Sequence, residues 1–277
     1  MVLALRIWVL ITESRNPVRV ARTISAVRRG SCRDRTTGKS SARRLVLRAR
    51  FNDWSLEIGH GTCSVAVVCG SSSPGRAGHR VKTVSEQTFL PVQASDQGRV
   101  WATLVVAFAV DPVERWLYPD AEQYLACFPA FLAAFGGRAF DAQTVYRLGE
   151  YSAVALWLAP GAEPDGDAIA VVLAETVSPG QHDDLFSVLG QMEAAHPAYP
   201  HWYLPWFGVD CALQGRGLGS ELMRPCLAEV DRSHLPAYLE TPNPRTVPFY
   251  ERAGFEVTGE AKAGDCPPVT FMLRAPR

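Results

Sequence analysis

The order of helical and extended segments from residue 86 onward predicts a mixed α/β sheet in a single domain. Two patterns carry this prediction: β-branched and aromatic runs of strand length, and longer segments whose apolar residues recur at helical spacing. Glycine and proline separate the two kinds of segment. The chain has 277 residues and is 47% hydrophobic and 20% charged, which is ordinary for a globular protein.

Helices are predicted where apolar residues recur every three to four positions. The first covers residues 96–109, with Asp96 as its N-cap. The second follows Asp120 and ends at Gly136 and Gly137. Further helices are expected at residues 165–177, 184–196, 218–230 and 243–254.

Strands are predicted in the remaining apolar and β-branched segments. Residues 144–160 form two of them, as a hairpin that turns near Gly149 and Glu150. Other strands are expected at residues 88–95, 201–210, 236–240, 255–262 and 268–274.

Charge is distributed unevenly along the chain. Residues 1–90 carry 16 Lys and Arg against 5 Asp and Glu, a net charge of +11. Residues 91–277 carry 12 against 23, a net charge of −11. Residues 1–85 are therefore expected to be a basic extension of the domain at 86–277. Three interpretations of the extension stay open: a stretch translated from a start codon placed too early, a disordered tail, and a transit or nucleic-acid-binding arm. The acidic domain argues against a nucleic-acid partner.

The seven cysteines include no CxxC pair, so reduced thiols in a cytoplasmic protein are expected, with no zinc site or disulfide framework. No apolar run approaches the ~20 residues that cross a membrane, and neither a membrane partner nor a metal is expected.

The segment "QGRGLGSELM" places three glycines, Gly215, Gly217 and Gly219, between a predicted strand and a predicted helix. Glycine allows another group to approach the backbone closely, and the first turn of a helix offers free N–H groups and a partial positive charge. Both properties favour a bound phosphate. A P-loop needs a Lys after its glycines and a dinucleotide fingerprint needs GxGxxG, and this segment has neither.

Two motifs together resemble the GCN5-related N-acetyltransferase (GNAT) superfamily. The first is Gln214-Gly215-Arg216-Gly217-Leu218-Gly219, which matches Q/R-x-x-G-x-G/A. The second runs from Asn243 through Tyr250 to Gly254-Phe255, one strand later. The resemblance covers residues 140–275 well and 86–140 loosely. It implies a mostly antiparallel central sheet flanked by helices, and acetyl-CoA as co-substrate.

The resemblance also implies roles for residues of this chain. The backbone of Gln214 to Gly219, with Ser220 at the start of the helix, would hold the pyrophosphate of coenzyme A, and Arg216 would add a positive charge or remain solvated. The strand end Phe207-Gly208-Val209 would offer backbone groups to the pantetheine arm. The acyl carbonyl would then lie where this strand splays from the strand at 236–240. Asn243 would contact the same arm or hold the end of the preceding strand, with a helix N-cap as the alternative.

For the chemistry, the resemblance implies direct attack of an amine on the thioester. Tyr250 matches the general acid, with an ordinary buried tyrosine as the alternative. Glu240 is the candidate base, with His201, Asp210 or a water chain as alternatives. The acceptor is an amine of a small molecule or peptide, and a homodimer stays open. A non-catalytic acyl-CoA sensor is the alternative function. Aromatic residues that could line the acceptor pocket are Trp116, Tyr118, Tyr124, Trp157, Trp202, Tyr203 and Trp206.

Overall fold

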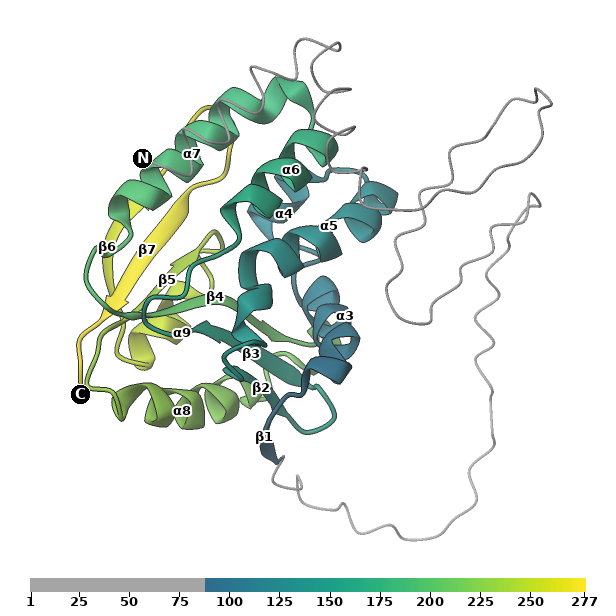
Figure 1. Cartoon of the computed structure of the whole chain (residues 1–277). Coiled ribbons are helices and arrows are strands. Elements are labelled where there is room, and N and C mark those ends of the chain that lie inside the picture. The colour runs from purple at the N-terminus through teal and green to yellow at the C-terminus, as the bar shows by residue number, and fades with distance from the viewer. Residues whose placement is uncertain (1–87) are drawn as a thin grey trace, which may run out of the picture. The chain divides into compact units, whose positions relative to one another are not determined.

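The structure, a computed structural model, describes residues 88–277 and shows a sheet with helices on both faces (Figure 1). The mixed α/β fold class is thereby confirmed. The predicted extension at residues 1–85 lies outside the described residues. The strands are β1 (Phe89–Pro91), β2 (Val145–Leu148), β3 (Ala153–Leu158), β4 (Trp202–Val209), β5 (Ala237–Thr241), β6 (Glu256–Ala261) and β7 (Val269–Arg274). The helices are α3 (Gln97–Ala107), α4 (Pro112–Leu117), α5 (Ala121–Gly136), α6 (Gly166–Thr176), α7 (His182–Ala195), α8 (Leu218–Asp231) and α9 (Val247–Arg252).

The seven strands of the described domain form one sheet in the order β1-β2-β3-β4-β5-β7-β6. Every neighbouring pair is antiparallel except β4 and β5, which run parallel. The expectation of a mostly antiparallel sheet is therefore confirmed. The last strand, β7, lies between β5 and β6 and is not at an edge.

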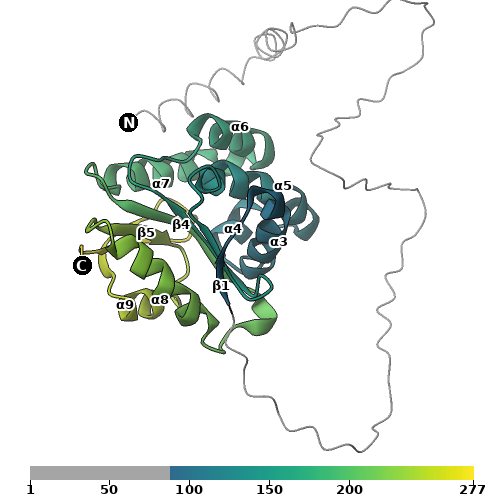
Figure 2. The same ribbon diagram turned by 60° about the horizontal axis from the view of Figure 1, so that its bottom comes forward.

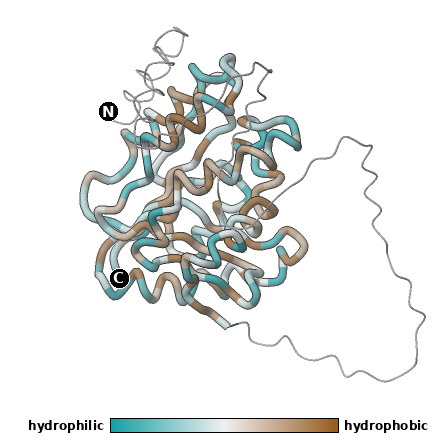
Figure 3. Tube along the Cα trace, turned by 45° about the vertical axis from the view of Figure 1, so that its right-hand side comes forward, coloured by the Kyte–Doolittle hydropathy of each residue, from teal (hydrophilic) through white to brown (hydrophobic). Residues whose placement is uncertain are grey.

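The sheet separates two layers of helices (Figure 2). Buried residues of α3, α5, α6 and α7 make one hydrophobic cluster with one face of the sheet. Buried residues of α8 and α9 make a second cluster with the other face. Hydrophobic and hydrophilic positions alternate along the helices (Figure 3), as expected when one side of a helix packs on a sheet and the other meets water.

The structure corrects two predicted details and adds one helix. Asp96 precedes α3, but its side chain accepts no hydrogen bond from that helix. Helix α4 was not predicted, because six residues are too few to show a period, although Asp111 caps it through Val113 and Glu114. The helix predicted at 243–254 begins only at Val247, after a turn. Asp120 does cap α5 as predicted, by accepting from the Gln123 N–H.

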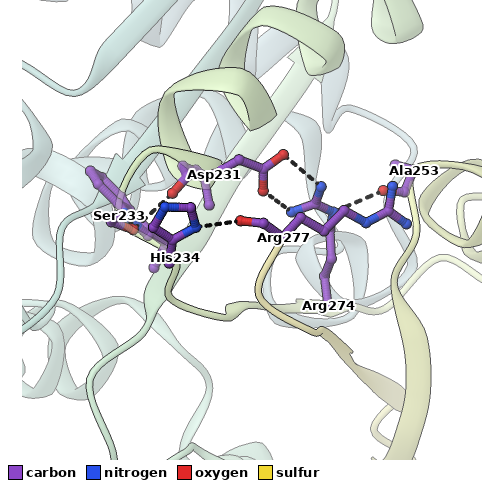
Figure 4. Close-up of polar contacts among 8 residues, drawn as sticks. Asp231, Ser233, His234, Ala253, Arg274 and Arg277 are labelled. Carbon is purple, nitrogen blue, oxygen red and sulfur yellow. Dashed lines mark hydrogen bonds and ion pairs between the residues drawn. The ribbon is translucent and has the colours of Figure 1, made fainter.

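A buried arginine of β7 joins the sheet to α8 and α9 near residue 274 (Figure 4). The Arg274 guanidinium donates to both carboxylate oxygens of Asp231, at 2.6 and 2.9 Å, and its Nε donates to the Ala253 carbonyl at 3.2 Å. Arg274 is 3% exposed. It therefore holds the end of α8 and the end of α9 against β7. The hydrogen bond from Arg274 lowers the pKa of Asp231.

Replacing Arg274 by Met should destabilise the fold by about 2 kcal/mol at neutral pH, because three charge-assisted hydrogen bonds are lost and Asp231 loses its partner. Because the pKa of Asp231 is lowered on folding, this difference should be present above pH 4 and shrink as the pH falls through the folded pKa. Urea unfolding at pH 7 and pH 3 measures it. Arg232→Met is the control, since its ion pair with Glu229 is exposed. Equal losses in the two variants would contradict this account.

Candidate functional site

The glycine loop between β4 and α8 has the backbone geometry that only glycine adopts easily. Gly215 has φ +75° and Gly217 has φ +84°, both in the left-handed region. Gly217 occupies the N-cap position of α8. A Cβ at Gly219 would meet the Phe249 ring at 3.4 Å. The first two glycines thus shape the loop, whereas at the third a side chain would make ordinary contact with the Phe249 ring of α9.

The start of α8 presents unused backbone donors. The first backbone bond of the helix runs from the Glu221 N–H to the Gly217 carbonyl, at 3.0 Å. The preceding N–H groups, of Leu218, Gly219 and Ser220, therefore have no acceptor within the helix. They add to the positive end of the helix dipole, so an anion is favoured at this point.

Strands β4 and β5 separate soon after they begin. Their parallel pairing joins only Trp202 with Ala237 and Tyr203 with Tyr238. Further along β4 the pairing with β3 is irregular, because Leu156 to Leu158 on β3 spans fewer residues than Tyr203 to Trp206 on β4. This bulge contains Pro205, whose missing N–H suits an unpaired position. The separation opens a gap in the middle of the sheet.

A pocket of about 600 Å³ occupies this gap and extends from the glycine loop to α4, α5 and α7. Its wall contains all but one of the residues that the sequence predicted for the cofactor and for catalysis. These are Phe207, Gly208, Val209, Gln214, Gly215, Gly217, Leu218, Gly219, Ser220, Glu240, Asn243 and Tyr250. The exception is Arg216, which is exposed and donates from Nη2 to the Ala212 carbonyl at 3.3 Å.

Tyr250 is 8% exposed and packs between Phe249 and Phe255, with ring centroids 5.0 and 6.0 Å away. Burial raises its pKa, and the negative charge of Asp111 raises it further. The phenol is therefore protonated at neutral pH, and its residue belongs to the pocket wall.

Asn243 starts the turn between β5 and α9. Its Oδ1 accepts from the Arg245 N–H at 3.1 Å, and its carbonyl accepts from the Thr246 hydroxyl at 2.7 Å. The expectation that Asn243 caps the helix is wrong, because Thr246 holds the N-cap position and α9 begins one residue later. Asn243 instead holds the turn against the pocket.

Glu240 lies on β5 just beyond the point where β4 and β5 separate, and its side chain is 7% exposed. Its Oε1 is 3.7 Å from Nδ1 of His196, a residue that sequence reasoning missed. His196 in turn contacts His201, one of the alternative bases. The other alternative, Asp210, accepts from the Ala212 N–H at 2.9 Å and caps the turn at Cys211–Leu213.

Two buried carboxyl groups, Asp111 at the N-cap of α4 and Glu114 within that helix, also belong to the pocket wall. Burial raises the pKa of Asp111 to about 6, against the lowering effect of its hydrogen bonds from the Glu114 and Val113 N–H groups. Burial raises the pKa of Glu114 well above its ordinary value, and Asp111 adds to the effect. Glu114 Oε2 has no hydrogen-bond partner among residues 88–277. The short helix gave no periodic signal from which the pair could have been found.

Of the aromatics predicted to line the acceptor pocket, Tyr203 and Trp206 belong to the wall of this pocket. The other aromatics lie elsewhere. Tyr118 and Tyr124 are core residues whose hydroxyls bond to Thr176 and to the Val105 carbonyl. Trp157 and Trp202 belong to the cluster on the α8 face, and Trp116 packs against the opposite cluster.

Within residues 88–277 no helix is long and apolar enough to cross a bilayer. Nor do His, Cys, Asp and Glu side chains gather there into a group that would hold a metal ion.

The fold is that of known acetyltransferase structures. The chain superposes on "histone acetyltransferase HPA2 and related acetyltransferase" from Corynebacterium glutamicum with a TM-score of 0.51 and 24% identity, over 70% of this chain and 98% of that one. It also superposes on the C-terminal condensation domain of Ebony with a TM-score of 0.52 and 12% identity, over 69% and 99% of the two chains. At these identities the likeness concerns the fold alone.

Two sequence comparisons find similarity to acetyltransferases. Residues 121–255 match the model of the acetyltransferase (GNAT) family. The chain is 26% identical over 184 residues to an uncharacterized N-acetyltransferase of Schizosaccharomyces pombe, covering 59% of this chain and 72% of that protein. Residues 121–255 are thus similar to the acetyltransferase (GNAT) family, and the relative matched over a longer stretch is named as an N-acetyltransferase.

Replacing Glu114 by Gln should stabilise the protein, and the gain should grow as the pH rises. Because the folded protein raises the pKa of Glu114, ionising this carboxyl costs stability only above the pKa it has in the unfolded chain. Thermal unfolding at pH 4.5 and pH 8 measures the difference. Glu122→Gln, at an exposed position of α5, is the control. A gain independent of pH would contradict the explanation.

Proposed function

We propose that this protein transfers the acetyl group of acetyl-CoA to a primary amine of a small molecule or peptide, by direct attack in a ternary complex. One observation carries the proposal: the glycine loop, the gap between β4 and β5, and Tyr250 all open on the same pocket. The proposed catalytic domain is residues 86–277, and a cytoplasmic location is part of the same proposal.

The donor would lie along the part of the pocket nearest α8. Backbone N–H groups from Gln214 to Ser220 would hold the pyrophosphate, because the start of α8 offers free donors and positive potential. The end of β4, Phe207 to Val209, would bind the pantetheine arm, with Asn243 on the opposite side of the gap. Arg245 and Arg252, also in the wall, add positive charge near this end.

The acetyl carbonyl would then stand in the gap between β4 and β5. Tyr250, kept protonated by burial, would donate its proton to the departing thiolate. Glu240, at the edge of the gap, would take a proton from the incoming amine. Both groups belong to the pocket wall, on α9 and β5 respectively.

The acceptor would enter from the side of α4, α5 and α7. This side combines apolar residues, such as Phe131 and Met192, with the acidic pair Asp111 and Glu114. A cation beside a buried carboxyl group with a raised pKa stabilises the ionised form of that group. A positively charged amine with an apolar portion fits these properties.

Calorimetric titration of the full chain with acetyl-CoA tests the donor site. Gly217→Glu should weaken binding at least 100-fold, because it places a carboxylate against the phosphates and strains a backbone at φ +84°. Gly161→Glu is the matched control: it has φ +86° and open space, and it lies outside the pocket. Equal affinity of Gly217→Glu and the parent would show that the loop does not hold the phosphates.

Thiol release from acetyl-CoA across a panel of monoamines, diamines and peptides tests catalysis. Tyr250→Phe should lower kcat about 100-fold or more while the affinity for acetyl-CoA stays within twofold, because only the proton donor is removed. Tyr146→Phe, at a half-buried tyrosine outside the pocket, is the control. Binding of acetyl-CoA with no thiol release for any amine would favour the alternative, a non-catalytic acyl-CoA sensor.

A further inference from the structure

A chain of three ionisable side chains leads from the pocket toward solvent. It begins at Glu240, whose side chain is 7% exposed. Glu240 Oε1 lies 3.7 Å from Nδ1 of His196, whose side chain is 30% exposed. The other ring nitrogen of His196, Nε2, is 2.9 Å from Nε2 of His201. His201 is half-buried, and its Nδ1 is 2.8 Å from the Tyr199 carbonyl.

The fold fixes the position of the central imidazole. His196 directly follows the last residue of α7, and its N–H still bonds to the Met192 carbonyl at 3.0 Å. The rings of Tyr203 and Tyr238 meet the imidazole at steep angles, 88° and 75°, with centroids 4.9 and 4.8 Å away. These two tyrosines form the last parallel pair before β4 and β5 separate. The same two tyrosines thus mark the start of the gap in the sheet and pack against the imidazole.

The Tyr199 carbonyl determines which nitrogens carry protons. A carbonyl only accepts, so Nδ1 of His201 must be the donor in that bond. In a neutral His201, Nε2 then carries the lone pair and accepts from Nε2–H of His196. A neutral His196 with its proton on Nε2 presents the lone pair of Nδ1 to Glu240. The bond from His196 to His201 and the bond from His201 to the Tyr199 carbonyl each have one donor and one acceptor, and both point outward. Nδ1 of His196 is left without a proton, so it can accept the one that Glu240 takes up.

We propose that His196 and His201 form a proton relay that carries the proton taken up by Glu240 from the acceptor amine to solvent. The proposal rests on the proposed acetyl transfer and adds a path for its proton. His196 and His201 act through Glu240 and are not placed against substrate, so they are relay and positioning residues.

Acetyl transfer from acetyl-CoA to an ammonium acceptor releases one proton overall. An ammonium acceptor loses two protons when it becomes an amide. Tyr250 donates one proton to the coenzyme A thiolate and recovers one of these two from the amine nitrogen. The remaining proton goes to Glu240 and then to Nδ1 of His196, while His196 releases its Nε2 proton to His201. His201 releases a proton to water. Both imidazoles reach solvent, so exchange with water restores the starting tautomers.

The surroundings of the relay suit proton passage. The 3.7 Å separation of Glu240 and His196 must shorten by less than ~1 Å to become a hydrogen bond, as is common when a site without substrate closes on one. Tyr203 and Tyr238 stay neutral, because burial and the charge of Glu240 raise their pKa values. Burial, with a smaller contribution from His196, lowers the pKa of His201, while Glu240 and the Tyr199 carbonyl oppose that lowering. A transferred proton is thus not retained on His201.

The kinetic test uses the full chain, acetyl-CoA and the most active amine of the panel. His196→Ala should lower kcat about tenfold or more at pH 7, leave the affinity for acetyl-CoA within twofold, and recover at least a third of the parent kcat with imidazole in the buffer. His196→Gln, which bonds but cannot relay, should be equally slow. His234→Ala, at an exposed histidine bonded to the Arg277 carbonyl, is the control and should match the parent.

An equilibrium test needs no turnover. Proton NMR titration of the His201 ring should show its pKa falling in Glu240→Gln, because the carboxylate stabilises the imidazolium, and rising in His196→Ala, because a neighbouring imidazole is removed. An unchanged His201 titration in both variants would overturn the relay.

The two tests separate failure of the relay from failure of the proposed function. An active parent with an unaffected His196→Ala variant overturns the relay and leaves acetyl transfer standing. A slow His196→Ala variant that imidazole does not restore also overturns it, since a structural defect explains that result. A parent that acetylates no amine overturns the proposed function, and with it any catalytic part for the relay, even if the His201 titration shifts as expected.

Discussion

The separation of β4 and β5 is the constraint on which the rest of the site depends. The strands share only two parallel pairs, and the bulge at Pro205 turns β4 away from regular pairing. Unpaired strand edges inside a sheet are costly unless something binds them. Here the unpaired edges line the pocket, so the backbone that cannot complete the sheet is available to a ligand.

The pocket is electrostatically asymmetric. At one end the start of α8 and the side chains of Arg245 and Arg252 favour negative charge. At the other end Asp111, Glu114 and Glu240 favour positive charge. An anionic donor and a cationic acceptor would therefore each be stabilised at opposite ends, with the reacting groups meeting between them. The net charge of −11 over residues 91–277 adds a long-range attraction for cations, which salt would weaken.

Much of the fold could be predicted from the sequence, because helices such as α8 and strands such as β4 have a clear period or a long β-branched run. The position of the glycine loop between a strand and a helix could also be predicted, and the structure adds that Gly215 and Gly217 adopt the left-handed conformation. Helix α4 has only six residues and could not show a period. His196 is far from Glu240 along the chain, so only the packing of α7 beside β5 brings them together. Which aromatics face the pocket depends on the layer each strand residue points to, and the wrong placement of Trp157 shows that limit.

The position of β7 also constrains how the domain is made. β7 is the last strand in the chain, yet it pairs with β5 on one side and β6 on the other, and it carries Arg274. During synthesis, the edges of β5 and β6 that pair with β7 therefore stay unpaired until Val269–Arg274 has left the ribosome. Only then can the ends of α8 and α9 be fixed by one guanidinium. In a nascent chain that lacks β7, β5 and β6 have no strand between them. The end of α8 is then not yet bonded to Arg274, so the start of this helix, beside the glycine loop, is not yet held through it.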